Sequence, residues 1–159
     1  MFTATPDKPA RYIPLAMIAF GVLMAIIGAF QGQRDMLMVY ALPGLILLAV
    51  LIGCWFYAPL GYEVTAHELR VKRRAGDWIL PRSAIRSVKK LEQSELGPAW
   101  RMAGNGGVFG YTGYYSSSSI GRMRWFVTRR GNYILIGREK GVPVLLSPDD
   151  PDALLTALR

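Results

Sequence analysis

The residues that could perform chemistry are few and scattered along this chain. His67 is the only histidine and Cys54 the only cysteine, and they lie in different segments. Side-chain catalysis needs a nucleophile beside a base, a pair of carboxylates or a set of metal ligands. The acidic residues around them show no such spacing; they include Glu63, Glu68, Asp77, Glu92, Glu95 and Glu139. We therefore expect no enzymatic activity, no metal site and no bound cofactor.

A segment rich in glycine and aromatic residues, 104–121, is the first candidate for binding. Glycine allows close backbone approach, and aromatic rings pack on apolar or flat surfaces. The spacing matches neither the phosphate-binding loop nor the dinucleotide fingerprint. Two interpretations remain open. The segment is a long loop whose rings cover the mouth of a barrel, or it contacts the bilayer interface or a partner protein through Phe109, Tyr111, Tyr114 and Tyr115.

Basic residues form the second candidate. Residues after position 60 hold 16 Lys and Arg against 9 Asp and Glu, so they carry most of the chain's net charge of +8. If they converge, they would attract anionic lipid headgroups, each charge contributing roughly 1 kcal/mol. The alternative is an ordinary solvated face, and nucleic acid is disfavoured because no recognition motif is present. The candidate headgroup-facing residues are Arg70, Lys72, Arg74, Arg82, Arg86, Lys89 and Lys90.

Two apolar stretches precede these candidates and must position them. Residues 12–30 and 36–57 contain no charged side chain and no histidine, and each is long enough to cross a hydrocarbon layer of about 30 Å. The short linker between them can join only antiparallel neighbours, which predicts a transmembrane hairpin. Basic residues flank the hairpin outside this linker, so we expect both termini to be cytoplasmic. Small residues favour close helix packing in lipid, and we expect it at Gly21, Ala25 and Gly28.

The remainder of the chain has the period-two alternation of short strands. These patterns cover residues 62–65, 69–73, 77–80, 85–91, 125–129, 133–137 and 142–146. Asp150 and Pro151 then supply a cap and a first helical position, and Leu154, Leu155 and Leu158 share one face of the helix that follows. The sequence predicts a mainly-β domain of about seven antiparallel strands with a C-terminal helix.

The motifs EVTAHELRV and ILPRSAIRSV and the ending PVLLSPDDPDALLTAL resemble the bacterial pleckstrin-homology-like (PH-like) domain families. The segment GNGGVFGYTGYY, followed by Gly121 and WFVTRR, resembles a membrane-bound branch in which two spans precede the domain. The resemblance implies a PH-like barrel closed by the C-terminal helix, held at a bacterial inner membrane. It does not imply phosphoinositide binding, because a shared fold is not a shared function.

Together these patterns predict three regions: a cytoplasmic tail at 1–11, a transmembrane hairpin at 12–57 and a cytoplasmic PH-like domain at 58–159. We expect a non-catalytic, membrane-anchored module that contacts other membrane proteins at the cytoplasmic face. The alternative is binding of anionic phospholipid headgroups by the basic face. Self-association into a homo-oligomer also remains open.

Overall fold

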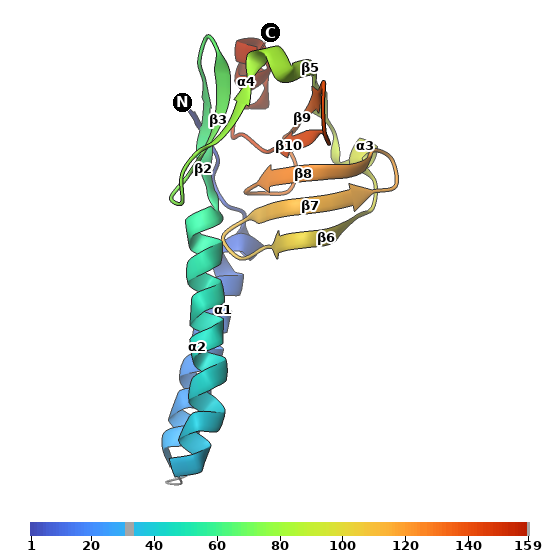
Figure 1. Ribbon diagram of the computed structural model, residues 1–159. Helices are drawn as coiled ribbons and strands as arrows, with labels where there is room; N and C mark the ends of the chain where they lie inside the picture. The colour runs from blue at the N-terminus through green and yellow to red at the C-terminus, as the bar shows by residue number, and fades with distance from the viewer. Residues whose placement is uncertain (31–33, 159) are drawn as a thin grey trace.

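The computed structural model describes residues 1–30 and 34–158. Two long helices form a stalk, and a β domain lies at one end of it (Figure 1). The helices α1 (Lys8–Phe30) and α2 (Arg34–Tyr57) pack side by side. Among the described residues, one helical segment, Lys8–Ile27, is long and apolar enough to cross a membrane, and Leu42–Tyr57 is a shorter apolar helix. The linker residues 31–33 lie outside the described part of the chain.

The strands of the β domain belong to two sheets. The first sheet has the order β1-β2-β3-β4 and consists of β1 (Phe2–Thr3), β2 (Pro59–Val64), β3 (Glu68–Arg73) and β4 (Trp78–Pro81). The second has the order β5-β9-β10-β8-β7-β6. It consists of β5 (Ile85–Leu91), β6 (Ala99–Gly106), β7 (Tyr111–Ser117), β8 (Gly121–Val127), β9 (Tyr133–Arg138) and β10 (Val144–Leu146).

The hydrophobic core lies between the two sheets and continues on the other face of the larger one. Between the sheets, Tyr62 joins them through its buried hydroxyl, which donates to the Phe126 carbonyl at 2.6 Å and accepts from the Ser147 N–H at 3.0 Å. The helix α4 (Pro151–Leu158) packs against β2, β5 and β9, and Leu154 and Leu158 are buried in this core. On the opposite face, the helix α3 (Gln93–Leu96) covers a second cluster centred on aromatic residues of β7, β8 and β9.

The expected closed barrel is wrong, because the described strands form two open sheets. β4 ends at Pro81, and the short 3-10 turn η1 (Arg82–Ala84) carries the chain from the first sheet into β5 of the second. Proline has no N–H with which to continue a ladder. The prediction of about seven antiparallel strands was also too low, since the described residues contain ten. One pairing, between β10 and β8, is parallel.

The β domain is attached to the helices without a flexible linker. Only Ala58 separates α2 from β2. At the other helix, Asp7 caps α1: its Oδ1 accepts from the Ala10 N–H at 2.9 Å, and its Oδ2 accepts from the Arg130 N–H and from the Tyr111 hydroxyl, each at 3.3 Å. The N-terminal residues are also part of the domain, because β1 pairs with β2. Both chain ends therefore lie at the same end of the stalk (Figure 1).

Candidate functional site

The glycine- and aromatic-rich segment forms most of the β6–β7 hairpin instead of a long loop. Gly104 and Gly113 face each other across it, both at positive φ, and a Cβ on either one would overlap the partner strand's backbone. Glycine is the residue that adopts this conformation without strain. Sequence patterns missed these strands because glycine is depleted in strands generally.

The four aromatic candidates of this segment do not form one exposed surface. Tyr111 and Tyr115 are buried, and the Tyr115 ring stacks on Trp125 with 4.0 Å between ring centres. Phe109 and Tyr114 are half-buried, and the Phe109 N–H donates to the Ala10 carbonyl at 3.2 Å. The segment thus fastens the larger sheet to the start of α1. Its half-buried members remain proposals for partner or membrane contact.

The seven basic candidates do not converge on one face. Four of them pair with carboxylates. Arg70 pairs with Glu68, Lys72 with Glu63 and Asp77, Lys89 with Glu95, and Lys90 with Asp152. The hydrogen bonds to Asp77 and then to Glu63 raise the pKa of Lys72. These hydrogen bonds of Lys72, like the ion pairs of Arg70, Lys89 and Lys90, leave less positive charge available to bind an external anion.

The other three basic candidates point to different parts of the molecule. The Arg74 guanidinium lies 4.0 Å from the ring centre of Trp55 and donates to its carbonyl at 3.2 Å. Arg82 donates to the carbonyl of Ala157 in α4 at 3.1 Å. Arg86 is exposed on β5. The expected patch is therefore divided between the α2 junction, the C-terminal helix and the open β5 edge.

A different basic site lies where the β domain meets α2, and we call it the junction groove. It has a volume of about 320 Å³. Arg73 and Arg124 line it, and in the described part of the chain neither forms an ion pair. Burial lowers the pKa of Arg73, and the nearby charge of Arg124 lowers it further. The remaining lining comes from α2, β6, β7 and β8: Gly53, Cys54, Tyr57, Gly104, Asn105, Thr112, Gly113, Tyr114 and Phe126.

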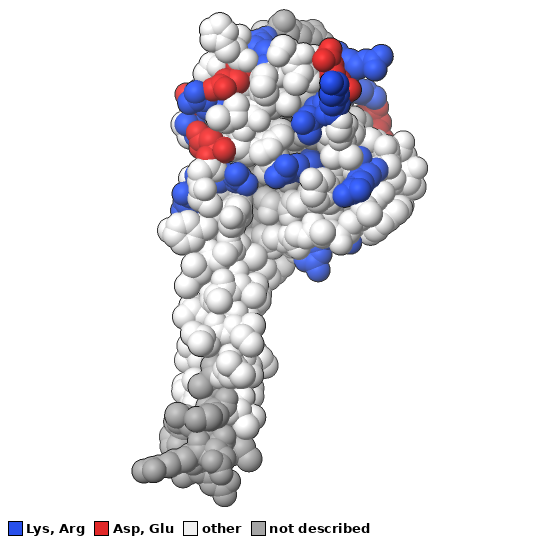
Figure 2. All heavy atoms as spheres, in the orientation of Figure 1, with Lys and Arg blue, Asp and Glu red and all other residues white. Residues whose placement is uncertain are grey.

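Aromatic rings hold the two groove arginines in place. Arg73 lies 5.5 Å from the ring centre of Tyr57, and Arg124 lies 5.0 Å from that of Phe126 and 5.8 Å from that of Tyr114. Arg122, two residues earlier on β8, lies over Tyr114 at 4.8 Å. Figure 2 shows a band of Lys and Arg side chains across the β domain, above a part of the stalk in which this face shows no charged side chains. Such an arrangement can bind an anion in the groove.

The alternation of residues along β3 and β8 contained a signal for the junction groove. Arg73 continues the row of core-facing residues Leu69 and Val71, and Arg124 precedes the buried Phe126 by two positions on β8. An arginine in a core-facing row marks a place where the core opens toward another group. The prediction instead followed the outward-facing row of β3, whose charges are paired.

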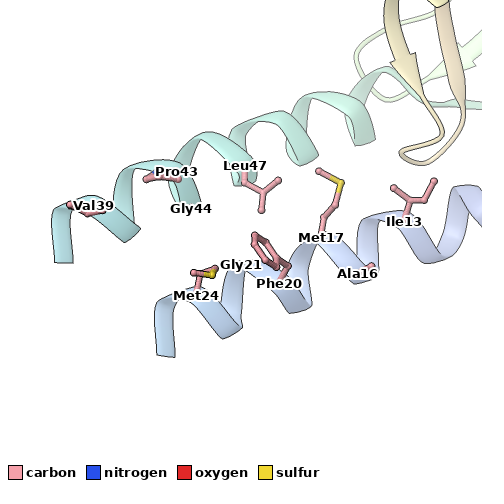
Figure 3. A pocket seen from close by; sticks show the side chains of 10 residues that line it. All are labelled: Ile13, Ala16, Met17, Phe20, Gly21, Met24, Val39, Pro43, Gly44 and Leu47. Carbon is pink, nitrogen blue, oxygen red and sulfur yellow. The ribbon is translucent and has the colours of Figure 1, made fainter. Parts of the chain in front are cut away.

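The stalk carries an apolar groove between its two helices, with a volume of about 750 Å³ (Figure 3). Its lining includes Phe20, Met24 and Pro43. A Cβ on Gly21 would lie 3.4 Å from the Leu47 Cδ2 of α2, so Gly21 is in close contact with the second helix. Ala25 is exposed beside a smaller groove. The surroundings of Gly28 lie outside what the structure describes.

Groups that could support catalysis remain apart in the fold. In the described part of the chain, no three His, Cys, Asp or Glu side chains gather as a metal site would require. His67 is exposed in the turn between β2 and β3, where its carbonyl accepts from the Arg82 N–H at 2.8 Å.

One comparison with known proteins gives a match, and it falls on the β domain. No curated protein and no solved structure matched the chain. The family model described as "Bacterial PH domain" matches residues 60–159, which is almost the whole β domain and more than half of the chain. The chain therefore belongs to the bacterial PH domain family.

Proposed function

We propose that this protein is a membrane-anchored, non-catalytic PH-like module that contacts other proteins at the cytoplasmic face of a bacterial inner membrane. The anchor is supported by the surface of the stalk. Leu15, Ile18, Phe20, Val22 and Leu23 of α1 are all at least 48% exposed, and α2 exposes apolar residues in the same way. In water such a surface would drive association, whereas lipid tails solvate it.

The junction between the helices and the β domain supports a fixed position at the headgroup level. Trp55, Phe56 and Tyr57 form the last turn of α2, and rings of this kind favour the membrane interface. Arg74 packs on Trp55, and Arg73 lies over Tyr57. By the positive-inside rule, these cations support a cytoplasmic location for the β domain.

The observation that carries protein contact is the open edge of the larger sheet. In the described part of the chain, β6 pairs only with β7, so its other edge is unpaired. Trp100 and Met102 on this strand are 53% and 54% exposed. An unpaired strand offers backbone donors and acceptors to an extended segment. β6 is also the strand of its sheet drawn nearest the stalk (Figure 1). We therefore propose an extended segment of another membrane protein as its partner.

Photocrosslinking in native membranes tests this contact. A photoreactive amino acid at position 100 or 102 should give protein adducts of discrete mass. The matched control is position 79 on β4, where Ile79 is 48% exposed on the edge strand of the other sheet. Adducts with lipid alone, or the same adducts from all three positions, would contradict the proposal. An adduct with a second copy of the chain would identify the partner as a homo-oligomer.

A second candidate function is the binding of anionic lipid headgroups, now at the junction groove. It is favoured by the two unpaired arginines, Arg73 and Arg124, that line a groove against the last turn of α2. At roughly 1 kcal/mol for each charge near the surface, replacing both should weaken binding of an anionic lipid by about 2 kcal/mol, or roughly 30-fold.

The full chain in nanodiscs that contain phosphatidylglycerol and phosphatidylcholine provides the test. Native mass spectrometry would count the phosphatidylglycerol molecules retained after gentle delipidation. R73Q/R124Q should lose them. The control R86Q/K140Q removes the same charge from two exposed residues and should retain them. Equal retention of the two lipids by the natural chain would refute headgroup selectivity.

A further inference from the structure

A third cavity, which is polar, lies on the face of the larger sheet that is turned away from β2 and β3. We call it the outer-face pocket. It has a volume of about 410 Å³, which is within the range of small-molecule sites. The α3 region forms one wall and the larger sheet the other. The lining residues are Gln93, Leu96, Gly97, Pro98, Ala99, Arg101, Gly106, Tyr111, Tyr115, Trp125, Arg130 and Tyr133.

We propose that the outer-face pocket binds a small organic anion from the cytoplasm, one that carries a carboxylate or phosphate group. Its lining contains two guanidinium groups, from Arg101 and Arg130, and no Asp or Glu. In the described part of the chain, neither arginine forms an ion pair. Guanidinium groups donate hydrogen bonds and never accept them. Two of them at one cavity therefore select a ligand with negatively charged acceptors.

A buried donor in the lining points to the same chemistry. Trp125 is 6% exposed, and its indole Nε1 is buried without a hydrogen-bond partner among the described atoms. Indole can only donate, and a buried donor left unpaired destabilises the fold. This atom is not accessible from the cavity, so an acceptor oxygen would pair with it only after the lining rearranges. The two arginines would supply the charge, and the indole would supply a directional contact.

Neighbouring groups do not neutralise the two cations. Burial raises the pKa of Tyr115 to about 12, so its hydroxyl stays neutral at physiological pH despite the nearby charges of Arg101 and Arg130. The Tyr115 hydroxyl donates to the Asn105 carbonyl. The Asp7 carboxylate, which caps α1 and accepts from the Arg130 N–H, lies at the edge of this region and offsets part of the positive charge. Two guanidinium groups against this one carboxylate leave the region with a net positive charge.

The rest of the lining suits the carbon skeleton of an organic ligand. The stacked pair Tyr115–Trp125 and the tilted ring of Tyr133, 6.3 Å from Trp125, form the aromatic wall of the cavity, and each is at most 6% exposed. Leu96 and Pro98 face the cavity from the α3 side. Flat apolar groups pack well on such rings. An aromatic carboxylate or aryl phosphate thus matches both the charge and the shape of the site. The inference does not depend on the contact proposed for β6.

The test uses the full chain in phosphatidylcholine nanodiscs with ¹⁵N-labelled tryptophan. Benzoate, phenyl phosphate and inorganic phosphate are titrated in turn. The indole cross-peak of residue 125 is identified by its disappearance in Trp125→Phe. We expect a saturable shift of this peak with benzoate or phenyl phosphate, and a weaker one with inorganic phosphate. Benzyl alcohol, which is similar in shape but neutral, should produce no shift.

Substitutions then assign the shift to the pocket. R101Q and R130Q remove exposed arginines at its rim and should each weaken binding at least tenfold. R86Q removes an exposed arginine elsewhere on the sheet and should leave the affinity unchanged. No saturable shift in the natural chain would overturn the proposal, as would equal responses to benzoate and benzyl alcohol. A shift in phosphatidylglycerol nanodiscs without added probe would assign the pocket to a lipid headgroup and overturn a cytoplasmic ligand.

Discussion

Replacing Tyr62 with phenylalanine is expected to weaken the connection between the two sheets. Tyr62 lies on β2 and is 0% exposed. Its hydroxyl donates to the Phe126 carbonyl on β8 at 2.6 Å and accepts from the Ser147 N–H, just after β10, at 3.0 Å. It is therefore a direct polar link between the smaller sheet and the larger one.

The size of the effect follows from these two contacts. Phenylalanine keeps the ring, so only the hydroxyl is lost and the hydrophobic packing changes little. The Ser147 N–H and one acceptor site of the Phe126 carbonyl lose their partner within the core. An unsatisfied buried group costs about 1–3 kcal/mol, so Tyr62→Phe should lower the free energy of unfolding by about 2–4 kcal/mol. This is a large share of the 5–15 kcal/mol typical of folded domains.

The measurement is equilibrium unfolding of the full chain in mixed micelles, followed by near-ultraviolet circular dichroism. Tyr12→Phe is the matched control, because Tyr12 is 63% exposed on α1 and its hydroxyl bridges no strands. We expect the control to change the unfolding free energy by less than about 0.5 kcal/mol. A similarly small change for Tyr62→Phe would refute the idea that this hydroxyl joins the sheets.

Three further perturbations have defined outcomes. Burial raises the pKa of Tyr62 and of Tyr115 to about 12, from 10.0 when unperturbed. The stability that these neutral hydroxyls contribute is complete below pH 10 and should fall as the pH rises toward 12, as thermal melts would show. Asp7→Ala removes the cap of α1 and should cost about 1–2 kcal/mol, with faster hydrogen exchange in the first turn; unchanged exchange would contradict the proposed attachment. Gly113→Ala should disrupt the β6–β7 hairpin, because its Cβ would overlap the Ala103 carbonyl. Gly121→Ala meets a similar positive φ but has nothing within 4 Å of its Cβ, so it should cost less, and equal melting temperatures for the two variants would show that the overlap with Ala103 does not matter.

Local patterns predicted much of the secondary structure. Residues 85–91 form a strand as expected, and Leu154 and Leu158 of the C-terminal helix are buried. Such features depend on one segment and its periodicity. Local patterns could not predict whether the barrel closes, because closure depends on how strands from distant segments pair. The chain changes sheets near Pro81, and β10 pairs with a parallel neighbour.

The candidate sites depended even more on distant pairing. Lys90 is paired with Asp152, a residue 62 positions away, so no local count of charges could reveal that it is neutralised. Arg73 and Arg124 lie on different sheets and meet only because β3 and β8 pack near the end of α2. The sequence alone could show only that Arg73 and Arg124 each stand in a row of core-facing residues.

The β domain is built from both ends of the chain, and this sets an order for its biosynthesis. β1 pairs with β2, although the two helices separate them in sequence. The Asp149 N–H donates to the Thr3 carbonyl, and the Asp149 carboxylate accepts from the Thr5 hydroxyl at 2.7 Å.

Residues 2–5 are synthesised well before Asp149, so they must wait for most of the β domain before their contacts exist. If the helices enter the bilayer as proposed, insertion precedes completion of the β domain. Only a hairpin whose two ends emerge on the same side can supply both parts. The first few residues would then act as a check on insertion, since a chain inserted with its start on the wrong side would lack its edge strand.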